Sequence, residues 1–269
     1  MEFLFFNSQN STRFEQSKIF TETTNGGTLI MLYRIRPFGD SITAGYGFGF
    51  GCKPQPHDPH PISCWPPNEV GGGYRAFLAG NTPNKLPMLM VGGRHDNSAM
   101  WMWQVGQQNH DGYASHTMAQ LMPYARQSRP SEVILLHVGT NDILTGSNGA
   151  QAADALRELL ITLLMTNSTT RILVAQIIPE FKYGKEAEIL DYNSRVPGIV
   201  DLFKPWGRDL RVVDMHPGMT SQDYMDGLHP NFAGYEKMAS RWRAAINTLP
   251  ELAQAAIPGE GVGHIGMAS

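Results

Sequence analysis

Three short polar segments of this chain carry the residue types that nucleophilic catalysis requires. Residues 39–43 read Gly-Asp-Ser-Ile-Thr, residues 139–142 read Gly-Thr-Asn-Asp, and residues 226–230 read Asp-Gly-Leu-His-Pro. A serine hydroxyl becomes an effective nucleophile only when a neighbouring base takes its proton. Together the segments supply a candidate nucleophile, a side-chain amide and an acid–base pair.

The chemistry gives each of these side chains a role. Ser41 is the candidate nucleophile, and His229 is the candidate base because a neutral imidazole accepts protons near physiological pH. Asp226 precedes His229 in a tight turn, so its carboxylate can hold the imidazole in the tautomer that accepts the serine proton. The amide of Asn141 and the backbone N–H of Ser41 can stabilise the oxyanion that forms when an ester carbonyl is attacked. The pattern predicts a serine-dependent ester hydrolase that needs no cofactor.

Each segment alone has a simpler interpretation. Gly-Asp-Ser is a common turn sequence, Gly-Thr-Asn-Asp can be a plain loop, and Asp-Gly-Leu-His can be a turn before a helix with Asn231 as its N-cap. Their order along the chain, and their positions after predicted strands, favour the catalytic interpretation.

The elements that must position these segments alternate between strand and helix. Apolar runs predict five strands, over residues 28–37, 86–91, 133–138, 172–178 and 210–215. Helices are predicted over residues 74–78, 115–124, 156–164, 185–204 and 235–246, with a break at Pro197-Gly198, whereas residues 92–112 are predicted to be irregular. This order implies a parallel sheet between two helix layers, with ligands bound at the carboxyl ends of the strands. We expect the three polar segments to converge at that edge.

Length and composition suit one globular domain. The chain has 269 residues, 42% of them hydrophobic, and a net charge of -3, which gives no indication of nucleic-acid binding. The predicted domain spans residues 28–250, between a flexible leader (1–27) and a flexible tail (251–269). No apolar run reaches about 18 residues, so no membrane-spanning helix is expected, and no standard signal peptide is visible. The compartment, secreted or cytoplasmic, and the oligomeric state stay open.

The three polar segments resemble those of the GDSL/SGNH hydrolase superfamily, and the resemblance extends from about residue 29 to residue 248. The segments at 39–43, 139–142 and 226–230 match the family's blocks that carry the nucleophilic serine, an oxyanion asparagine and the Asp-x-x-His pair. The resemblance implies that Ser41, Asp226 and His229 form a catalytic triad and that Asn141 lines the oxyanion hole.

Further segments resemble the acetyl xylan esterase branch, carbohydrate esterase family three, namely residues 73–75, 110–113, 137–140, 192–193 and 230–235. The resemblance implies a flavodoxin-like three-layer α/β/α sandwich with a five-stranded parallel sheet. It also implies a small-molecule or carbohydrate ester as substrate, with acetyl as the acyl group. A short-chain lipase, a thioesterase or an aryl esterase of the same superfamily is the alternative, followed by a non-catalytic carbohydrate-binding protein.

The chain departs from the family pattern at one oxyanion position. The family's second block ends in a glycine whose N–H contacts the oxyanion, and an alignment without gaps puts that glycine on Ser115. A backbone N–H survives this replacement, but the side chain narrows the acyl pocket. Gly112 is the alternative donor if the loop is shifted.

The loops that are expected to border Ser41, residues 45–72 and 92–112, are rich in Gly, Pro, His, Asn, Gln and Trp. Polar groups with isolated aromatic rings suit a sugar, and no amphipathic helix is placed to act as a lipase lid. Trp65, Trp101 and Trp103 can stack on a sugar ring or pack in the interior. We also expect Asp40 to contact the substrate.

Two cysteines and several histidines leave alternatives open. Cys52 and Cys64 can form a disulfide in an oxidising compartment or remain free thiols. Together with His57 and His60 they could provide the four ligands of a zinc site. A loop with solvated histidines is the preferred interpretation, and no metal is predicted. His137, inside a predicted strand, is expected to be a hydrogen-bonded core residue.

Overall fold

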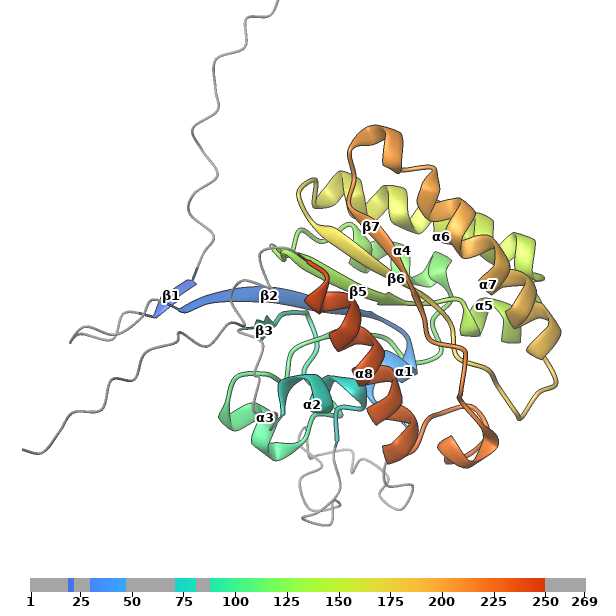
Figure 1. The fold of residues 1–269 in the computed structure, drawn as a ribbon, viewed down its shortest axis with the longest axis horizontal. Helices are drawn as coiled ribbons and strands as arrows, with labels where there is room; N and C mark the ends of the chain where they lie inside the picture. The colour runs from blue at the N-terminus through green and yellow to red at the C-terminus, as the bar shows by residue number, and fades with distance from the viewer. Residues whose placement is uncertain (1–18, 22–29, 47–70, 81–87, 250–269) are drawn as a thin grey trace, which may run out of the picture.

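The computed structural model describes residues 19–21, 30–46, 71–80 and 88–249. Five parallel strands form the main sheet: β2 (Ile30–Gly39), β3 (Met88–Met90), β5 (Val133–His137), β6 (Arg171–Gln176) and β7 (Leu210–Asp214). β3 and β5 pair with opposite edges of β2, and β6 and β7 follow β5, which gives the order β3-β2-β5-β6-β7 (Figure 1). The predicted five-stranded parallel sheet is confirmed.

Two short strands that the sequence did not indicate extend this sheet to seven strands within the described residues. β1 (Ile19–Thr21) pairs antiparallel with the start of β2. β4 (Asp111–Gly112) pairs with the end of β2, beyond β3 on the same edge. Residues 92–112 are therefore not wholly irregular, since they also include helix α3 (Met100–Gln104).

Helices cover both faces of the sheet (Figure 1). On one face lie α3, α2 (Tyr74–Ala79) and α8 (Phe232–Asn247). On the other lie α4 (Met118–Ala125), α6 (Gly149–Thr166) and α7 (Glu186–Asp201), with the short α5 (Thr140–Leu144) beside them. The remaining described elements are the short helix α1 (Ser41–Ala44), which follows β2, and two 3-10 turns, η2 (Lys204–Trp206) and η3 (Ser221–Asp223).

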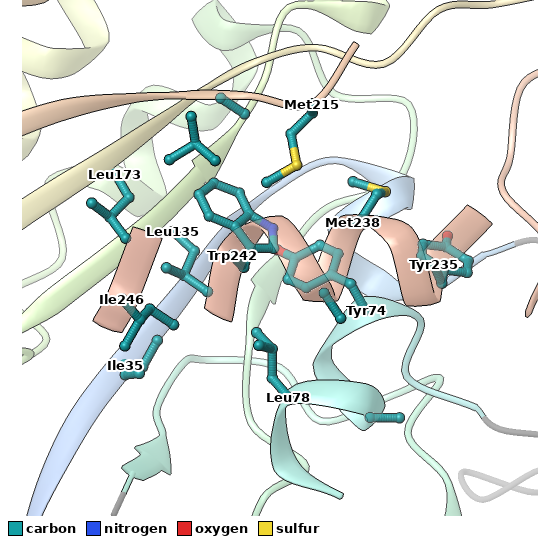
Figure 2. Close-up of a cluster of buried hydrophobic side chains, with 14 of the residues drawn as sticks. Ile35, Tyr74, Leu78, Leu135, Leu173, Met215, Tyr235, Met238, Trp242 and Ile246 are labelled. Atoms are coloured by element: carbon teal, nitrogen blue, oxygen red, sulfur yellow. The ribbon is translucent and has the colours of Figure 1, made fainter. Parts of the chain in front are cut away.

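The strand side chains alternate between two cores because successive residues of a strand point to opposite faces. All five residues of β5 are buried; Val133 and Leu135 belong to the core under α8, and Ile134 and Leu136 to the core under α6. Figure 2 shows the first core, in which the Trp242 ring of α8 lies 6.0 Å from the Tyr74 ring of α2. This packing fixes α8, whose start immediately follows the 226–230 segment.

Helix α7 is continuous, so the predicted break at Pro197-Gly198 is wrong. Proline has no N–H to donate to the carbonyl four residues earlier, which belongs to Asn193. The side-chain amide of Gln176 donates to that carbonyl instead, at 2.7 Å. A contact from β6 thus satisfies the acceptor that the proline leaves free.

Several sequence-based predictions lie outside the described residues. They concern the leader up to residue 18, the tail from residue 250, and the loop that contains Cys52, His57, His60, Cys64 and Trp65. Among the described helices, none has the length and hydropathy that a membrane crossing requires.

Candidate active site

Ser41 lies directly after the carboxyl end of β2, as the first residue of the short helix α1 (Ser41–Ala44). Asp40 caps this helix, since its Oδ1 accepts the Ile42 N–H at 2.9 Å. A Cβ on Gly39 would lie 2.3 Å from the carbonyl oxygen of His137, so only glycine lets β2 approach β5 this closely before the turn. The backbone thereby presents Ser41 at the edge of the sheet, with 8% of its surface exposed.

A chain of hydrogen bonds links Ser41, His229 and Asp226. The Ser41 Oγ lies 3.0 Å from Nε2 of His229, and Nδ1 of the same ring lies 3.0 Å from Oδ2 of Asp226. Ser41 and His229 are 188 residues apart in sequence. The structure therefore brings the predicted nucleophile, base and acid together in one line.

The 226–229 turn also satisfies the second oxygen of Asp226. Oδ1 accepts the backbone N–H of His229 at 2.7 Å and that of Leu228 at 3.0 Å. Partial burial raises the pKa of Asp226, but the hydrogen bonds from His229 and Leu228 outweigh burial and lower the pKa to about 2. The carboxylate is ionised at neutral pH and is aimed at Nδ1 of the imidazole.

The loop after β6 packs against this turn, a contact that the sequence did not reveal. The Phe181 N–H donates to the Gly227 carbonyl at 2.7 Å, and the Lys182 Nζ lies 3.8 Å from Oδ2 of Asp226. The loop is held by the buried carboxylate of Glu180, which accepts the Lys182 N–H at 2.9 Å and further backbone N–H groups. The loop at the carboxyl end of β6 thus supports the turn that carries Asp226.

Asn141, at the start of α5, is tied to the loop after β4. Its side-chain Nδ2 donates to the His116 carbonyl at 3.1 Å, which fixes the plane of the amide. The neighbouring Asp142 accepts the Met118 N–H with both carboxylate oxygens, at 3.2 and 3.1 Å. These contacts keep the Asn141 amide and the segment around Ser115 in a constant relative position.

Ser115 adopts a backbone conformation that favours glycine, with φ of 62°. It is the third residue of a turn closed by the hydrogen bond from the His116 N–H to the Tyr113 carbonyl. Gly112 is not placed as the alternative oxyanion donor, because its N–H donates to Nδ1 of His110 at 3.0 Å. Ser115 is exposed whereas Gly112 is buried, so Ser115 is the better placed of the two candidate oxyanion donors.

Asp40, which the sequence analysis expects to contact the substrate, lies in the interior of the structure. Its carboxylate is buried, with 1% of the residue exposed, and its Oδ1 is engaged in the cap of α1. Burial raises the pKa of Asp40 to about 7, and burial also raises that of the nearby Asp142 to about 6. The role that the structure shows for Asp40 is to shape the turn that carries Ser41.

Two buried arginines hold the segments around the site. Arg75 donates from Nε to the Thr43 carbonyl and from Nη2 to the Ala44 carbonyl, both at 3.0 Å, and so caps the end of α1. Arg36 forms a fully buried ion pair with Asp111 of β4 at 2.6 Å. The end of α1 and the pairing of β2 with β4 are thus each held by charge-assisted hydrogen bonds.

Other residues singled out from sequence have different surroundings. The Trp103 ring packs edge-on against His95 at 4.9 Å, and only the backbone of Trp101 is described, within α3. His137 is buried as expected, but neither ring nitrogen has a hydrogen-bond partner within the described part of the chain, so that expectation is wrong in this respect. Burial lowers the pKa of His137 to about 4, and its ring is neutral at physiological pH.

An aromatic residue next to the site escaped the sequence interpretation. The Tyr46 ring lies 6.2 Å from the His229 ring at an interplanar angle of 36°. The only available signal was its position just after the residues of α1, which does not give the direction of the ring.

Comparisons with known proteins identify the family to which the chain belongs. Residues 38–237 match the family model described as "GDSL-like Lipase/Acylhydrolase family". A protein described as "Multidomain esterase", from Ruminococcus flavefaciens, is 25% identical over 244 residues, which cover 79% of this chain and 28% of that protein. The chain therefore spans about 28% of the length of this curated relative.

Solved structures share the fold. A carbohydrate esterase family 3 structure from Talaromyces cellulolyticus has a TM-score of 0.60 and 18% identity, over 84% of this chain and 98% of that one. A family 3 carbohydrate esterase from Clostridium thermocellum has a TM-score of 0.62 and 23% identity, over 84% of this chain and 99% of that one.

Proposed function

This chain belongs to the GDSL-like lipase/acylhydrolase family, and from that premise we propose that it hydrolyses carboxylic esters through a covalent acyl-enzyme on Ser41. The observation that carries the proposal is the hydrogen-bonded chain from Asp226 through His229 to Ser41, with both links at 3.0 Å. Distances in this range allow direct proton transfer from the nucleophile to the base.

The reaction proceeds in two acyl-transfer steps. The Ser41 oxygen attacks the ester carbonyl while its proton moves to Nε2 of His229, and Asp226 stabilises the imidazolium through Nδ1. The imidazolium then protonates the alcohol oxygen as the carbon–oxygen bond breaks, which leaves the acyl group on Ser41. A water molecule, deprotonated by His229, attacks the acyl-enzyme and releases the acid. Serine and histidine are restored, and no cofactor takes part.

Three donors are assigned to the oxyanion. They are the side-chain amide of Asn141, the N–H of Ser41 and the N–H of Ser115. The Ser41 N–H lies at the first residue of α1, where a helix leaves N–H groups without intrahelical partners. The amide of Asn141 carries a second hydrogen besides the one donated to His116, and that hydrogen is available to the oxyanion.

The substrate class assigned is a short-chain ester, with acetyl as the acyl group and a carbohydrate as the alcohol. The replacement of the family's glycine by Ser115 supports a small acyl pocket, because it adds a side chain next to the backbone N–H that is assigned to the oxyanion. The carbohydrate esterases with similar folds support a sugar as the alcohol.

The test combines labelling with substitution. An organophosphonate ester is expected to label wild-type protein at Ser41, and Ser41→Ala is expected to lose both labelling and turnover while it unfolds at the wild-type temperature. Ser194→Ala, which removes an exposed hydroxyl on α7, is the matched control. Labelled peptide that maps to another serine contradicts the assignment.

A further inference from the structure

Exposure increases stepwise from the nucleophile outwards. Ser41 is 8% exposed, the His229 side chain is 14% exposed and Tyr46 is 37% exposed. A substrate that approaches Ser41 past the more exposed His229 comes next to the side chain of Tyr46. The Tyr46 ring, 6.2 Å from the His229 ring, borders that approach.

The backbone of Tyr46 is held in place by the catalytic segments. Its N–H donates to the Ser41 carbonyl at 3.0 Å, and its own carbonyl accepts the hydroxyl of Tyr235 from α8. The residue is thus anchored to the nucleophile helix on one side and to α8 on the other. Because the backbone of Tyr46 is fixed on both sides, the ring can move only about its own side-chain bonds and stays beside His229, where it can be a platform for a ligand.

The chemistry of the proposed reaction locates the alcohol half of the ester. His229 protonates the departing oxygen, so that oxygen must come within hydrogen-bond reach of Nε2. The carbon skeleton attached to it then extends from the buried Ser41 towards solvent, past His229. Within the described part of the chain, the Tyr46 ring is the exposed ring that lies beside the His229 ring, whereas Trp103 packs against His95 and Phe181 against Tyr224.

We propose that Tyr46 is the platform on which the alcohol half of the ester stacks, and that it selects alcohols with a ring-shaped apolar face, such as a pyranose, over open-chain ones. The proposal rests on the proposed esterase function and adds to it the residue that determines alcohol specificity. Stacking on an aromatic ring requires its face and not its hydroxyl, so the selectivity depends on the ring alone.

The test measures kcat/KM for acetates that differ only in the alcohol: cyclohexyl acetate and xylose tetraacetate against ethyl acetate. Tyr46→Ala is expected to lower the ratio of ring to open-chain kcat/KM by roughly fivefold to tenfold, mainly through KM. Tyr46→Phe is expected to keep the ratio. Trp206→Ala, which removes an exposed ring from η2, is the matched control and is also expected to keep it.

The outcomes separate this inference from the proposed function. An unchanged ratio in Tyr46→Ala, or an equal loss in Tyr46→Phe, overturns the inference while esterase activity stands. If Tyr46→Ala does not fold, Tyr46→Leu, which keeps more of the volume but removes the aromatic face, gives the same comparison. A wild type that hydrolyses none of the acetates and is not labelled at Ser41 overturns the proposed function itself.

Discussion

Asp226 offers the most direct test, because its two carboxylate oxygens have separate tasks. Oδ1 accepts two backbone N–H groups and holds the turn, whereas Oδ2 accepts from Nδ1 of His229. In Asp226→Asn the carbonyl oxygen can keep the turn, but the amide NH₂ replaces Oδ2 and donates to Nδ1. The imidazole is then held in the tautomer with Nε2 protonated, which cannot accept the Ser41 proton.

The two substitutions Asp226→Asn and Asp226→Ala are expected to separate catalysis from stability. Asp226→Asn should lower kcat by about 10²- to 10⁴-fold, which is roughly 3–5 kcal/mol of transition-state stabilisation. Asp226→Ala also loses the turn contacts. The fall of the Asp226 pKa from 3.8 to about 2 corresponds to roughly 2 kcal/mol of stability at neutral pH. Because 24% of the side chain is exposed, we expect about 1–2 kcal/mol after solvent screening.

The pH dependence of this stability has a defined sign. The folded-state pKa of Asp226 lies below the unfolded-state value, so its stabilisation is complete above about pH 4 and is lost as the pH falls through about 2. The difference in free energy of unfolding between wild type and Asp226→Ala should therefore shrink as the pH falls from 7 to 3, as measured by urea unfolding.

Initial rates of p-nitrophenyl acetate hydrolysis give the catalytic half of the test. Asp201→Asn is the matched control, since it makes the same acid-to-amide change at an exposed ion pair with Lys204. An Asp226→Asn variant that retains turnover within tenfold of wild type would refute the role assigned to the carboxylate.

Three further predictions concern the oxyanion donors and the acyl group. Asn141→Ala should lower kcat by roughly 10²-fold with little change in KM, since its hydrogen bond strengthens only in the transition state; steady-state kinetics in which only KM changes would place Asn141 in substrate binding instead. Ser115→Gly should retain turnover, because the proposed donor is the backbone N–H, and should relieve about 1 kcal/mol of strain at φ of 62°; kinetics and urea unfolding measure both effects, and a collapse of activity would mean that the hydroxyl itself takes part. In a series of p-nitrophenyl esters, kcat/KM should fall from acetyl to butyryl and be lowest for octanoyl; a steady rise along the same series would favour a lipase.

Much of the fold and the central residues of the site could be predicted from the sequence, because the signals are local. Asp226 and His229 lie within one turn, so their contact depends on only a few backbone angles. The buried strand at 133–138 is visible as a continuous apolar run. Ser41 and His229 are distant in sequence, but both follow strands of a parallel sheet, whose carboxyl ends share one edge.

Other features depended on which groups form hydrogen bonds with each other in the folded chain. The sequence does not specify these partners when they come from different segments. From the sequence, the N–H of Gly112 could donate to an oxyanion. In the structure it donates to Nδ1 of His110 instead. Pro197 is a helix breaker by propensity, yet the amide of Gln176 satisfies the carbonyl that it leaves free. In both cases a partner from another segment decides the outcome.

The sequence by itself determined the residue types of the site, their order and the sheet edge to which they belong. Only the tertiary structure decided where side chains point: Asp40 into the buried cap of α1, Tyr46 beside His229 and Lys182 towards Asp226. The physical reason is that composition and periodicity report which face of an element is buried. The direction of a turn residue is instead set by the non-local backbone and side-chain groups that surround it.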